Sequence, residues 1–218
     1  MKSTLDTAAA SIVAIDLAKE VFQLTFADGA HRVLERKRLT RAAFARELVQ
    51  RPPLHAVMEA CGSAHHWGRR FAALGHRVTL LPAHQVKPYV LRRKTDRTDA
   101  DGLLEALRCA DLRPVPVKTP DQQGIQGLHR LREHHKGQRT AAINLVRGLL
   151  REFGLVIPAG AGKVRPAVLA ALEDGDNALP MALRAALAMM LEQIASAEVA
   201  MQCIEASLRE FSARDARS

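Results

Sequence analysis

The chain has 218 residues, of which 48% are hydrophobic and only 4% aromatic. This length can bury one substantial core plus an appended structure, and so few aromatic side chains argue against a protein that binds single strands by base stacking. The formal net charge of +9 indicates an anionic partner. Three widely spaced cysteines indicate neither a disulfide framework nor a zinc site. With no signal-peptide pattern and no apolar run of membrane-spanning length, we expect a cytoplasmic protein without a membrane partner.

The N-terminal part of the chain predicts three strands in succession. Apolar, β-rich runs cover residues 11–17 and 21–27, and a partial alternation of apolar and polar residues continues over 31–39. The pair Asp28-Gly29 between the second and third run is typical of a β-hairpin. We therefore expect these strands to pair in antiparallel fashion.

Helices and strands alternate in the stretch that follows. Thr40 is the expected N-cap of a helix that Pro52 and Pro53 end. The further expected elements are a strand over 54–60, a helix from Gly62-Ser63 to Leu74, a strand over 77–82 and a helix over 98–109. This order predicts an α/β, ribonuclease H-like domain over residues 8–112, with a mixed five-stranded sheet and flanking helices.

The rest of the chain is predicted to be helical. A Pro-rich linker over 113–120 leads into a helical region over 121–218, with a basic helix over 122–153, a Gly/Pro loop over 158–166 and a last helix after Pro180. The apolar residues of the last helix repeat every three and then four positions, at Leu183, Leu187, Met190, Ile194, Ala197, Met201, Ile204, Leu208 and Phe211. This heptad pattern predicts a coiled coil. Its partner is either the earlier helix or the same helix of a second chain.

Four acidic residues are candidates for a divalent-metal site. Asp16 lies in an apolar strand, where a carboxylate without a cation is costly, and Glu59 lies at the end of another strand. Asp96 and Asp99 are three residues apart at a helix start and so share one face. Carboxylates suit Mg²⁺ or Mn²⁺, and two such ions can stabilise the charges that develop in phosphodiester chemistry. For Asp96 alone, a helix N-cap is the competing interpretation.

Basic residues close to these acids are candidates for phosphate contact. Residues 31–51 carry seven Lys or Arg against two acids, residues 84–97 carry five against one, and residues 121–165 carry eight against three. Residues 168–218 carry four against eight, which argues against a nucleic-acid backbone there. Each basic window taken alone also fits a solvated surface. The individual candidates for nucleic-acid binding are Arg92, Arg93, Lys94, Arg97, Arg130, Arg139 and Arg147.

The residues also bear on two other functions, an ATPase and a non-catalytic binding module. An actin-like ATPase also begins with an apolar strand that ends in Asp, but it needs glycine and a hydroxyl residue next, where this chain has Leu17-Ala18-Lys19. The stretch Ala159-Gly160-Ala161-Gly162-Lys163 lacks the Lys-Ser/Thr pair and the preceding strand of a phosphate loop. A non-catalytic module that binds nucleic acid and dimerises remains a serious alternative.

Several motifs, taken in order, resemble those of the DEDD transposases of bacterial insertion sequences, the IS110 family with its IS1111 branch. They are Ile15-Asp16, Met58-Glu59-Ala60-Cys61-Gly62, Pro82-Ala83, Val86-Lys87-Pro88-Tyr89 and Lys94-Thr95-Asp96-Arg97-Thr98-Asp99-Ala100, with a helical continuation through Arg139-Thr140 to Gly154. The resemblance covers about the first 110 residues most specifically.

This resemblance implies a RuvC-like domain in which Asp16, Glu59, Asp96 and Asp99 bind Mg²⁺. It also implies DNA strand cleavage and exchange in transposition, with element-end and target DNA, a structured guide RNA and a second copy of the chain as partners, at the bacterial nucleoid. Family members continue into a second domain that supplies a serine nucleophile. The sequence ends at Ser218 without that domain, so we expect an N-terminal portion of such a transposase.

Overall fold

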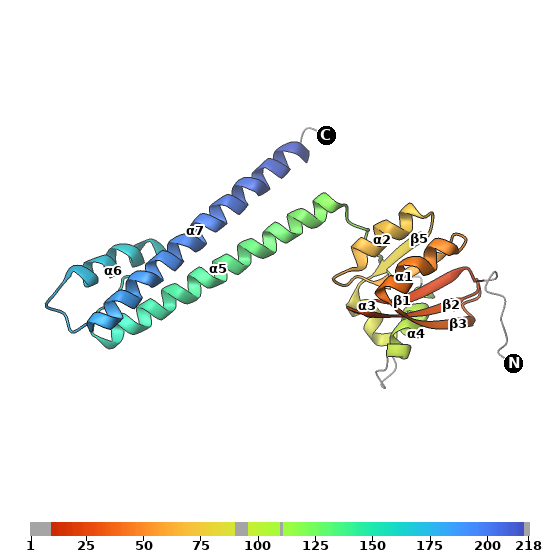
Figure 1. Cartoon of the computed structure of the whole chain (residues 1–218), viewed down its shortest axis with the longest axis horizontal. Helices are drawn as coiled ribbons and strands as arrows, with labels where there is room; N and C mark the ends of the chain where they lie inside the picture. Colours follow the sequence, from red (N-terminus) through yellow and green to blue (C-terminus); the bar gives the residue numbers. More distant parts are fainter. Residues whose placement is uncertain (1–9, 90–95, 110, 216–218) are drawn as a thin grey trace. The chain divides into compact units, whose positions relative to one another are not determined.

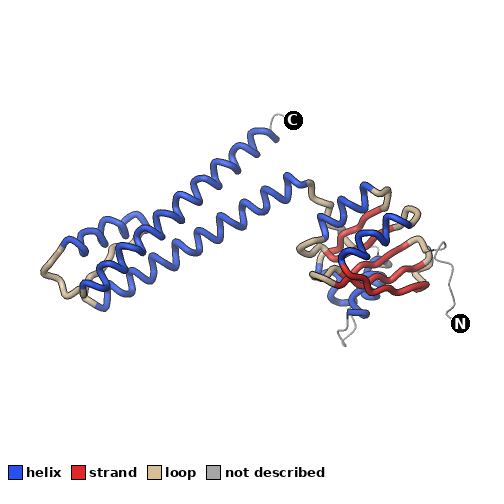
Figure 2. The backbone as a smooth tube through the Cα atoms, viewed as in Figure 1, coloured by secondary structure: helices blue, strands red, loops and turns tan. Residues whose placement is uncertain are grey.

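The computed structural model describes residues 10–89, 96–109 and 111–215, and the side chains of residues 96–99 and 214–215 are not among those described. The chain divides into two compact units, Met1–Thr119 and Pro120–Ser218. The first is built around a sheet, and the second is made of helices (Figures 1 and 2). No helix in the described ranges is long and apolar enough to cross a membrane.

A mixed five-stranded sheet forms the centre of the first unit. Its strands are β1 (Ile12–Asp16), β2 (Val21–Ala27), β3 (Val33–Thr40), β4 (His55–Glu59) and β5 (Arg77–Leu81). They lie in the order β3-β2-β1-β4-β5. The first three strands pair antiparallel, while β4 pairs parallel with both β1 and β5. The sequence-based prediction of a mixed α/β sheet with an antiparallel start is confirmed.

The connection between β2 and β3 is a loop that Asp28 organises. The Asp28 carboxylate accepts hydrogen bonds from the backbone N–H groups of Ala30 and Arg32, both at 2.9 Å. His31 in this loop adopts a φ of 64°, a left-handed conformation that histidine tolerates better than most residues. The predicted hairpin therefore exists, but its loop is longer than the two residues Asp28-Gly29.

Helices cover both faces of the sheet. On one face, α1 (Arg41–Glu47) and α2 (Ala64–Ala73) bury a cluster of aromatic side chains against β1, β2 and β4. On the other face, α4 (Asp96–Leu107) packs against alternate residues of the same strands, among them Ala14 and Val57. A short α3 (Ala83–Val86) and two 3-10 turns, Leu48–Gln50 and Lys87–Tyr89, complete this unit. As predicted, Thr40 caps α1, and its hydroxyl accepts a hydrogen bond from the N–H of Ala43.

The segment that precedes the second unit packs on the first. Val115 forms an isolated antiparallel bridge with Leu80 of β5. Val117 lies so close to Gly68 of α2 that a Cβ on this glycine would stand 3.1 Å from a Val117 methyl group. Arg69 donates a hydrogen bond of 2.6 Å to the backbone oxygen of Lys118. Most of the segment expected as a linker is thus attached to the edge of the sheet beside α2.

The second unit consists of α5 (Pro120–Glu152), α6 (Val164–Glu173) and α7 (Met181–Asp215), with a 3-10 turn at Ala161–Lys163. The long helices α5 and α7 lie side by side and run in opposite directions (Figure 1). Two ion pairs, Arg132–Glu205 at 2.8 Å and Arg139–Glu198 at 3.5 Å, join them. These pairs are seven residues apart on both helices and in reverse order, which is the register of an antiparallel pair.

The heptad pattern of α7 faces the interior of this unit. Leu187, Ile194 and Met201 are buried, and the first two belong to a core that includes Val146 and Leu150 of α5. The earlier helix therefore covers much of the stripe, which is one of the two partners that the sequence left open. The sequence did not predict α6, which begins inside the expected 158–166 loop. Its proline, Pro166, lies in the first turn, where a missing N–H costs little.

Candidate active site

Asp16 and Glu59 lie next to each other at the carboxyl ends of two central strands of the sheet. They are the last residues of β1 and β4, and the residues before them, Ile15 and Met58, are register partners in a parallel pair. Neighbouring strands are about 4.8 Å apart, so the backbones of the two acidic residues are separated by one strand spacing. Both residues are half-buried.

The two carboxylates also point to the same face of the sheet. Side chains alternate along a strand, so Asp16 shares a face with Ala14, and Glu59 shares a face with Val57. Ala14 and Val57 both belong to the cluster that α4 covers. The sequence predicted Glu59 at a strand end and Asp16 within a strand, whereas in the structure both are the last residues of their strands, and the pairing of β1 with β4 brings them together.

Asp96 and Asp99 lie in the helix that covers this face. Asp96 is the first residue of α4, and Asp99 follows three positions later. Ala100, Leu103 and Leu104 of this helix are buried. The side chains of Asp96 and Asp99 lie outside the described ones. The structure thus puts their helix on the face that carries Asp16 and Glu59, and their role as metal ligands stays a prediction.

Asp101 is held by contacts within the first unit. Its carboxylate accepts a hydrogen bond of 3.1 Å from the hydroxyl of Thr25 and forms an ion pair of 2.9 Å with Arg36. Asp101 follows Asp99 by two positions in α4. Its contacts tie α4 to strands β2 and β3.

The predicted phosphate-binding residues fall into three groups. Arg92, Arg93 and Lys94 lie outside the described residues, and Arg97 belongs to α4 without a described side chain. Arg130 is exposed on α5. Two others already make contacts within the second unit: Arg139 pairs with Glu198, and Arg147 donates hydrogen bonds of 2.9 Å to two loop carbonyl groups. Their role in binding nucleic acid stays a prediction.

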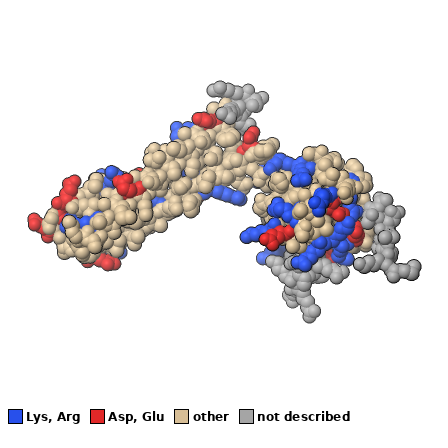
Figure 3. Space-filling model, viewed as in Figure 1, with Lys and Arg blue, Asp and Glu red and all other residues tan. Residues whose placement is uncertain are grey.

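Basic side chains gather on the surface of the first unit, which Figure 3 shows in blue. On the α1 side of β3 they are balanced by acids, because Lys37 and Arg51 both bind Glu47, at 2.7 Å and 2.6 Å. Burial raises the pKa of Glu47, but the hydrogen bonds from the two cations outweigh it and hold this pKa below the usual value. The charge on this side is therefore largely compensated within the protein.

The donor set at the sheet edge fits a hard divalent cation. It consists of carboxylate oxygens, which Mg²⁺ and Mn²⁺ prefer, and two of the four candidates are neighbours on one face. Among the side chains that the structure describes, no group of three or more His, Cys, Asp or Glu residues is placed to hold a metal ion. A site of more than two ligands therefore depends on the side chains of Asp96 and Asp99.

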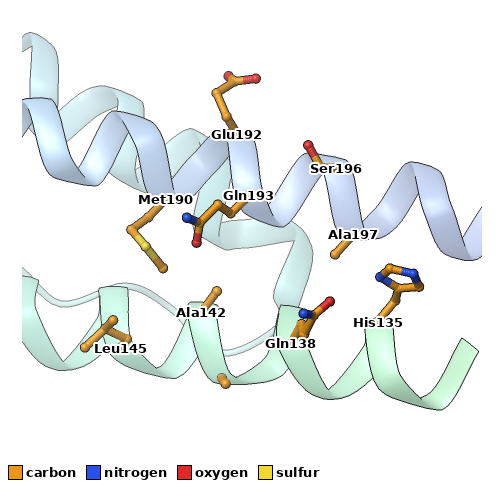
Figure 4. Close-up of a pocket in the computed structure, with 10 residues that line it drawn as sticks. His135, Gln138, Ala142, Leu145, Met190, Glu192, Gln193, Ser196 and Ala197 are labelled. Carbon is orange, nitrogen blue, oxygen red and sulfur yellow. The ribbon is translucent and has the colours of Figure 1, made fainter. Parts of the chain in front are cut away.

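A separate hollow of about 730 Å³ lies between α5 and α7 of the second unit. Figure 4 shows Met190 and Gln193 reaching from α7 toward α5, while Glu192 points away. Apolar carbons make up most of its surface, and the only carboxylate among its lining residues is that of Glu192. This hollow therefore lacks the ligands of a metal-dependent active site.

A mixed sheet covered by helices, with two acids at the ends of neighbouring parallel strands, defines a ribonuclease H-like α/β domain. The chain matches the family of DEDD transposases of the IS110 group, described as transposases, over residues 13–154. Because this match covers well over half of the chain, the protein belongs to that family.

Curated relatives support the same assignment. The chain is 41% identical over 184 residues to a probable family 20 transposase of Pseudomonas aeruginosa, a match that covers 84% of this chain and 54% of the relative. It is 41% identical over 150 residues to the transposase for insertion sequence element IS1111A of Coxiella burnetii, with 69% and 41% of the two chains covered. The transposase for element IS1328 of Yersinia enterocolitica is 33% identical over 155 residues, with 71% and 46% covered. The chain thus spans about half the length of the curated relatives it matches.

Proposed function

We propose that the first unit carries the metal-binding half of a transposase active site, which cuts and exchanges DNA strands with Mg²⁺ or Mn²⁺. The placement of Asp16 and Glu59 as neighbours on one face is the observation that carries this proposal. The helix that begins at Asp96 and contains Asp99 packs on the same face. Membership in a transposase family supports DNA as the substrate.

Each group has a distinct role in this proposal. The four carboxylates bind the metal, and the bound metal stabilises negative charge on the oxygens of a phosphodiester. The strand ends fix Asp16 and Glu59 in a rigid frame, because β1 and β4 are central strands of the sheet. Arg92, Arg93, Lys94 and Arg97 are proposed to contact phosphates beside this site.

The second unit is proposed to bind nucleic acid and a second copy of the chain. Arg130 is exposed on α5 for contact with element-end DNA, target DNA or a structured guide RNA. Leu131 and Leu145 of the same helix are 51% and 52% exposed, which supports an apolar contact between copies. A protein with these partners works at the bacterial nucleoid.

Metal binding by carboxylate variants tests this proposal directly. Calorimetric titration of the full chain with Mn²⁺ is expected to show that Glu59→Gln and Asp99→Asn each lower the affinity by at least about tenfold, because each removes an anionic ligand. Glu105→Gln is the matched control, since Glu105 is an exposed acid on α4 that lies near Arg108. Equal Mn²⁺ affinities in all four proteins would refute the shared site.

Nucleic-acid cleavage separates the transposase proposal from its competitor. With element-end DNA and Mg²⁺, strand cleavage that Glu59→Gln abolishes supports the proposed reaction. Binding to DNA that needs no metal and is unchanged by Glu59→Gln, together with an absence of cleavage, supports a non-catalytic binding module instead. Thus the two functions predict opposite results for the same pair of proteins.

A further inference from the structure

Four polar side chains form a row across the sheet on the face that α4 covers. Gln23 is the register partner of Asp16 on one side and of Arg38 on the other. The pairing of Ile15 with Met58 places Glu59 next to Asp16 in the same row. Because paired residues on neighbouring strands point to the same face, the row consists of Arg38, Gln23, Asp16 and Glu59. A cation thus lies in line with the two carboxylates of the candidate metal site.

The environment of Arg38 differs from that of the other cations on β3. Lys37 is bound by Glu47, and Arg36 is bound by Asp101. Arg38 is exposed, and within the described residues no acidic side chain forms an ion pair with it. The charge of Arg38 is therefore available for an anion from outside the protein.

A shallow hollow runs along the strand that carries Arg38. It has a volume of about 410 Å³ and is lined by Gln23 together with residues 33–38. In the described part of the chain β3 is an edge strand of the sheet, so the backbone groups on its outer side have no neighbouring strand to pair with. The hollow thus combines three basic side chains and one acid, Glu35, which is paired with Arg51, with main-chain N–H donors, and its excess of positive charge suits a phosphate backbone.

We propose that Arg38 and Gln23 bind the backbone of the nucleic-acid strand that enters the carboxylate site, one or a few nucleotides from the scissile phosphate. Two strand spacings place the backbone of Arg38 about 10 Å from that of Asp16. The guanidinium group suits this contact because its planar array of N–H donors matches phosphate oxygens in pairs. The inference rests on the proposed function for the identity of the strand, since it treats Asp16 and Glu59 as the point to which the strand leads.

Arg36 lies on the same face of β3 as Arg38 but is held by an acidic residue of α4. Thr25 and Arg36 are register partners that lie two residues along β2 and β3 from the pair Gln23 and Arg38. Both Thr25 and Arg36 contact Asp101. Asp101 thereby fixes Arg36, whereas Arg38 extends two residues further, in the row of the carboxylates. Of these two arginines, the one level with the candidate metal site is the one without an acidic partner in the described structure.

Phosphate is common to DNA and RNA, so the ligand is a nucleic-acid strand recognised through its backbone. Such contacts fix the position of the strand and carry no information about its base sequence. Arg38 is accordingly a positioning residue for the strand. It is expected to affect affinity equally for different base sequences.

A binding experiment without divalent metal tests this inference independently of the proposed catalysis. The full chain, Arg38→Ala and Arg38→Lys are titrated with a fluorescent single-stranded DNA, an RNA of the same sequence and the DNA duplex, in EDTA and over a series of salt concentrations. Arg46→Ala is the matched control, because Arg46 is an exposed arginine on α1, which covers the opposite face of the sheet. Fluorescence of Trp67, the chain's one tryptophan, reports whether the core of the first unit stays intact in each variant.

The expected result is specific to one face. Arg38→Ala should weaken binding several-fold and lower the slope of log affinity against log salt by about 0.7 for a single strand, or about 0.9 for a duplex, which is the change for one lost phosphate contact. Arg38→Lys should retain this slope, and Arg46→Ala should match the unmodified chain. The arm with the largest effect identifies whether DNA or RNA occupies the hollow.

Two outcomes would overturn the inference. One is an affinity and slope unchanged by Arg38→Ala, and the other is an equal loss in Arg38→Ala and Arg46→Ala, which would indicate a diffuse attraction to net positive charge. The binding measurement is made in EDTA, so it does not depend on metal binding by Asp16 and Glu59. A failed metal titration beside a positive Arg38 result therefore rejects the proposed function and leaves the strand contact standing.

Discussion

The two units of this protein achieve stability in different ways. In the first, the rings of Phe22, Phe44, Trp67 and Phe71 pack between helices and a sheet in which β1 pairs with the later strand β4. In the second, aliphatic side chains pack along a seam between α5 and α7. Groups that require accurate placement, such as the neighbouring carboxylates, lie on the sheet-based unit. The helical unit offers length and exposed surface.

The largest expected effect is the loss of an aromatic ring from the first core. Phe44 stacks on Phe22 with 4.4 Å between ring centroids and meets Trp67 at 4.6 Å. Phe44→Ala should lower the free energy of unfolding of the first unit by about 3–5 kcal/mol, because it leaves a cavity among fixed rings. Denaturant unfolding followed by Trp67 fluorescence measures this unit alone. The helical signal of the second unit, followed by circular dichroism, should keep its midpoint; a common shift of both signals would show that the units unfold together.

A smaller effect is expected from an arginine that caps carbonyl groups in the second unit. The guanidinium of Arg184 donates hydrogen bonds to the backbone oxygens of Ala171, Leu172 and Asp174, at 3.1, 2.9 and 2.8 Å. Arg184→Met removes these donors and should lower the free energy of unfolding of the second unit by about 1–3 kcal/mol, since partly buried carbonyl groups lose their partners. Circular dichroism during thermal unfolding provides the measurement. A midpoint identical to that of the unmodified chain would mean that water replaces the guanidinium without cost.

The third prediction is a pH dependence of the first unit. Burial lowers the pKa of His65, and the nearby positive charges of Lys118 and Arg69 lower it further. The folded state therefore keeps this imidazole neutral while the unfolded chain takes up a proton below about pH 6.5. The stability from this histidine is complete above pH 6.5 and is lost as the pH falls toward the lowered pKa. His55, whose pKa burial also lowers, acts in the same direction.

Unfolding followed by Trp67 fluorescence between neutral and mildly acidic pH checks this sign. The midpoint should fall with pH in the unmodified chain and fall less in His65→Asn. A midpoint that rises on acidification would contradict the neutral state of this histidine. In the native contact, Nδ1 of His65 accepts a hydrogen bond of 3.2 Å from the backbone N–H of Lys118. Acid should therefore also loosen the segment that joins the first unit to α5.

The smallest effect is expected at the surface of the helical pair. Arg132 and Glu205 form an ion pair of 2.8 Å with side chains that are 34% and 39% exposed. Glu205→Gln should lower the free energy of unfolding by only about 0.2–1 kcal/mol, because solvent screens such pairs. Urea unfolding at low salt is the suitable measurement, with Glu192→Gln as a control on the same helix. A loss well above 1 kcal/mol would show that the register of α5 and α7 depends on this pair more than on the apolar seam.

The outline of the fold could be read from local patterns. The Asp28-Gly29 hairpin, the Thr40 cap and the apolar runs of β1 and β4 are all encoded by neighbouring residues, and each appears in the structure. Local patterns did not predict α6, because Gly160, Gly162 and Pro166 together suggested a loop. A helix nevertheless begins at Val164, since it tolerates Pro166 in its first turn. Local patterns also did not identify Gln23, Thr25, Arg36 and Arg38 as part of the carboxylate face. The available signal was the alternation along β2 and β3, but its meaning depends on the register between strands.

The sequence encodes the residue types and the local elements that they form. It supplied the four acids, the basic windows and the heptad pattern, and it predicted Asp16 within one strand and Glu59 at the end of another. The folded chain pairs β1 with β4, places Arg38 in the row of the carboxylates and covers the stripe of α7 with α5. These arrangements could not be read from local patterns, because strand pairing and helix packing depend on contacts between residues far apart in the chain, whereas propensity and periodicity act over one or two turns.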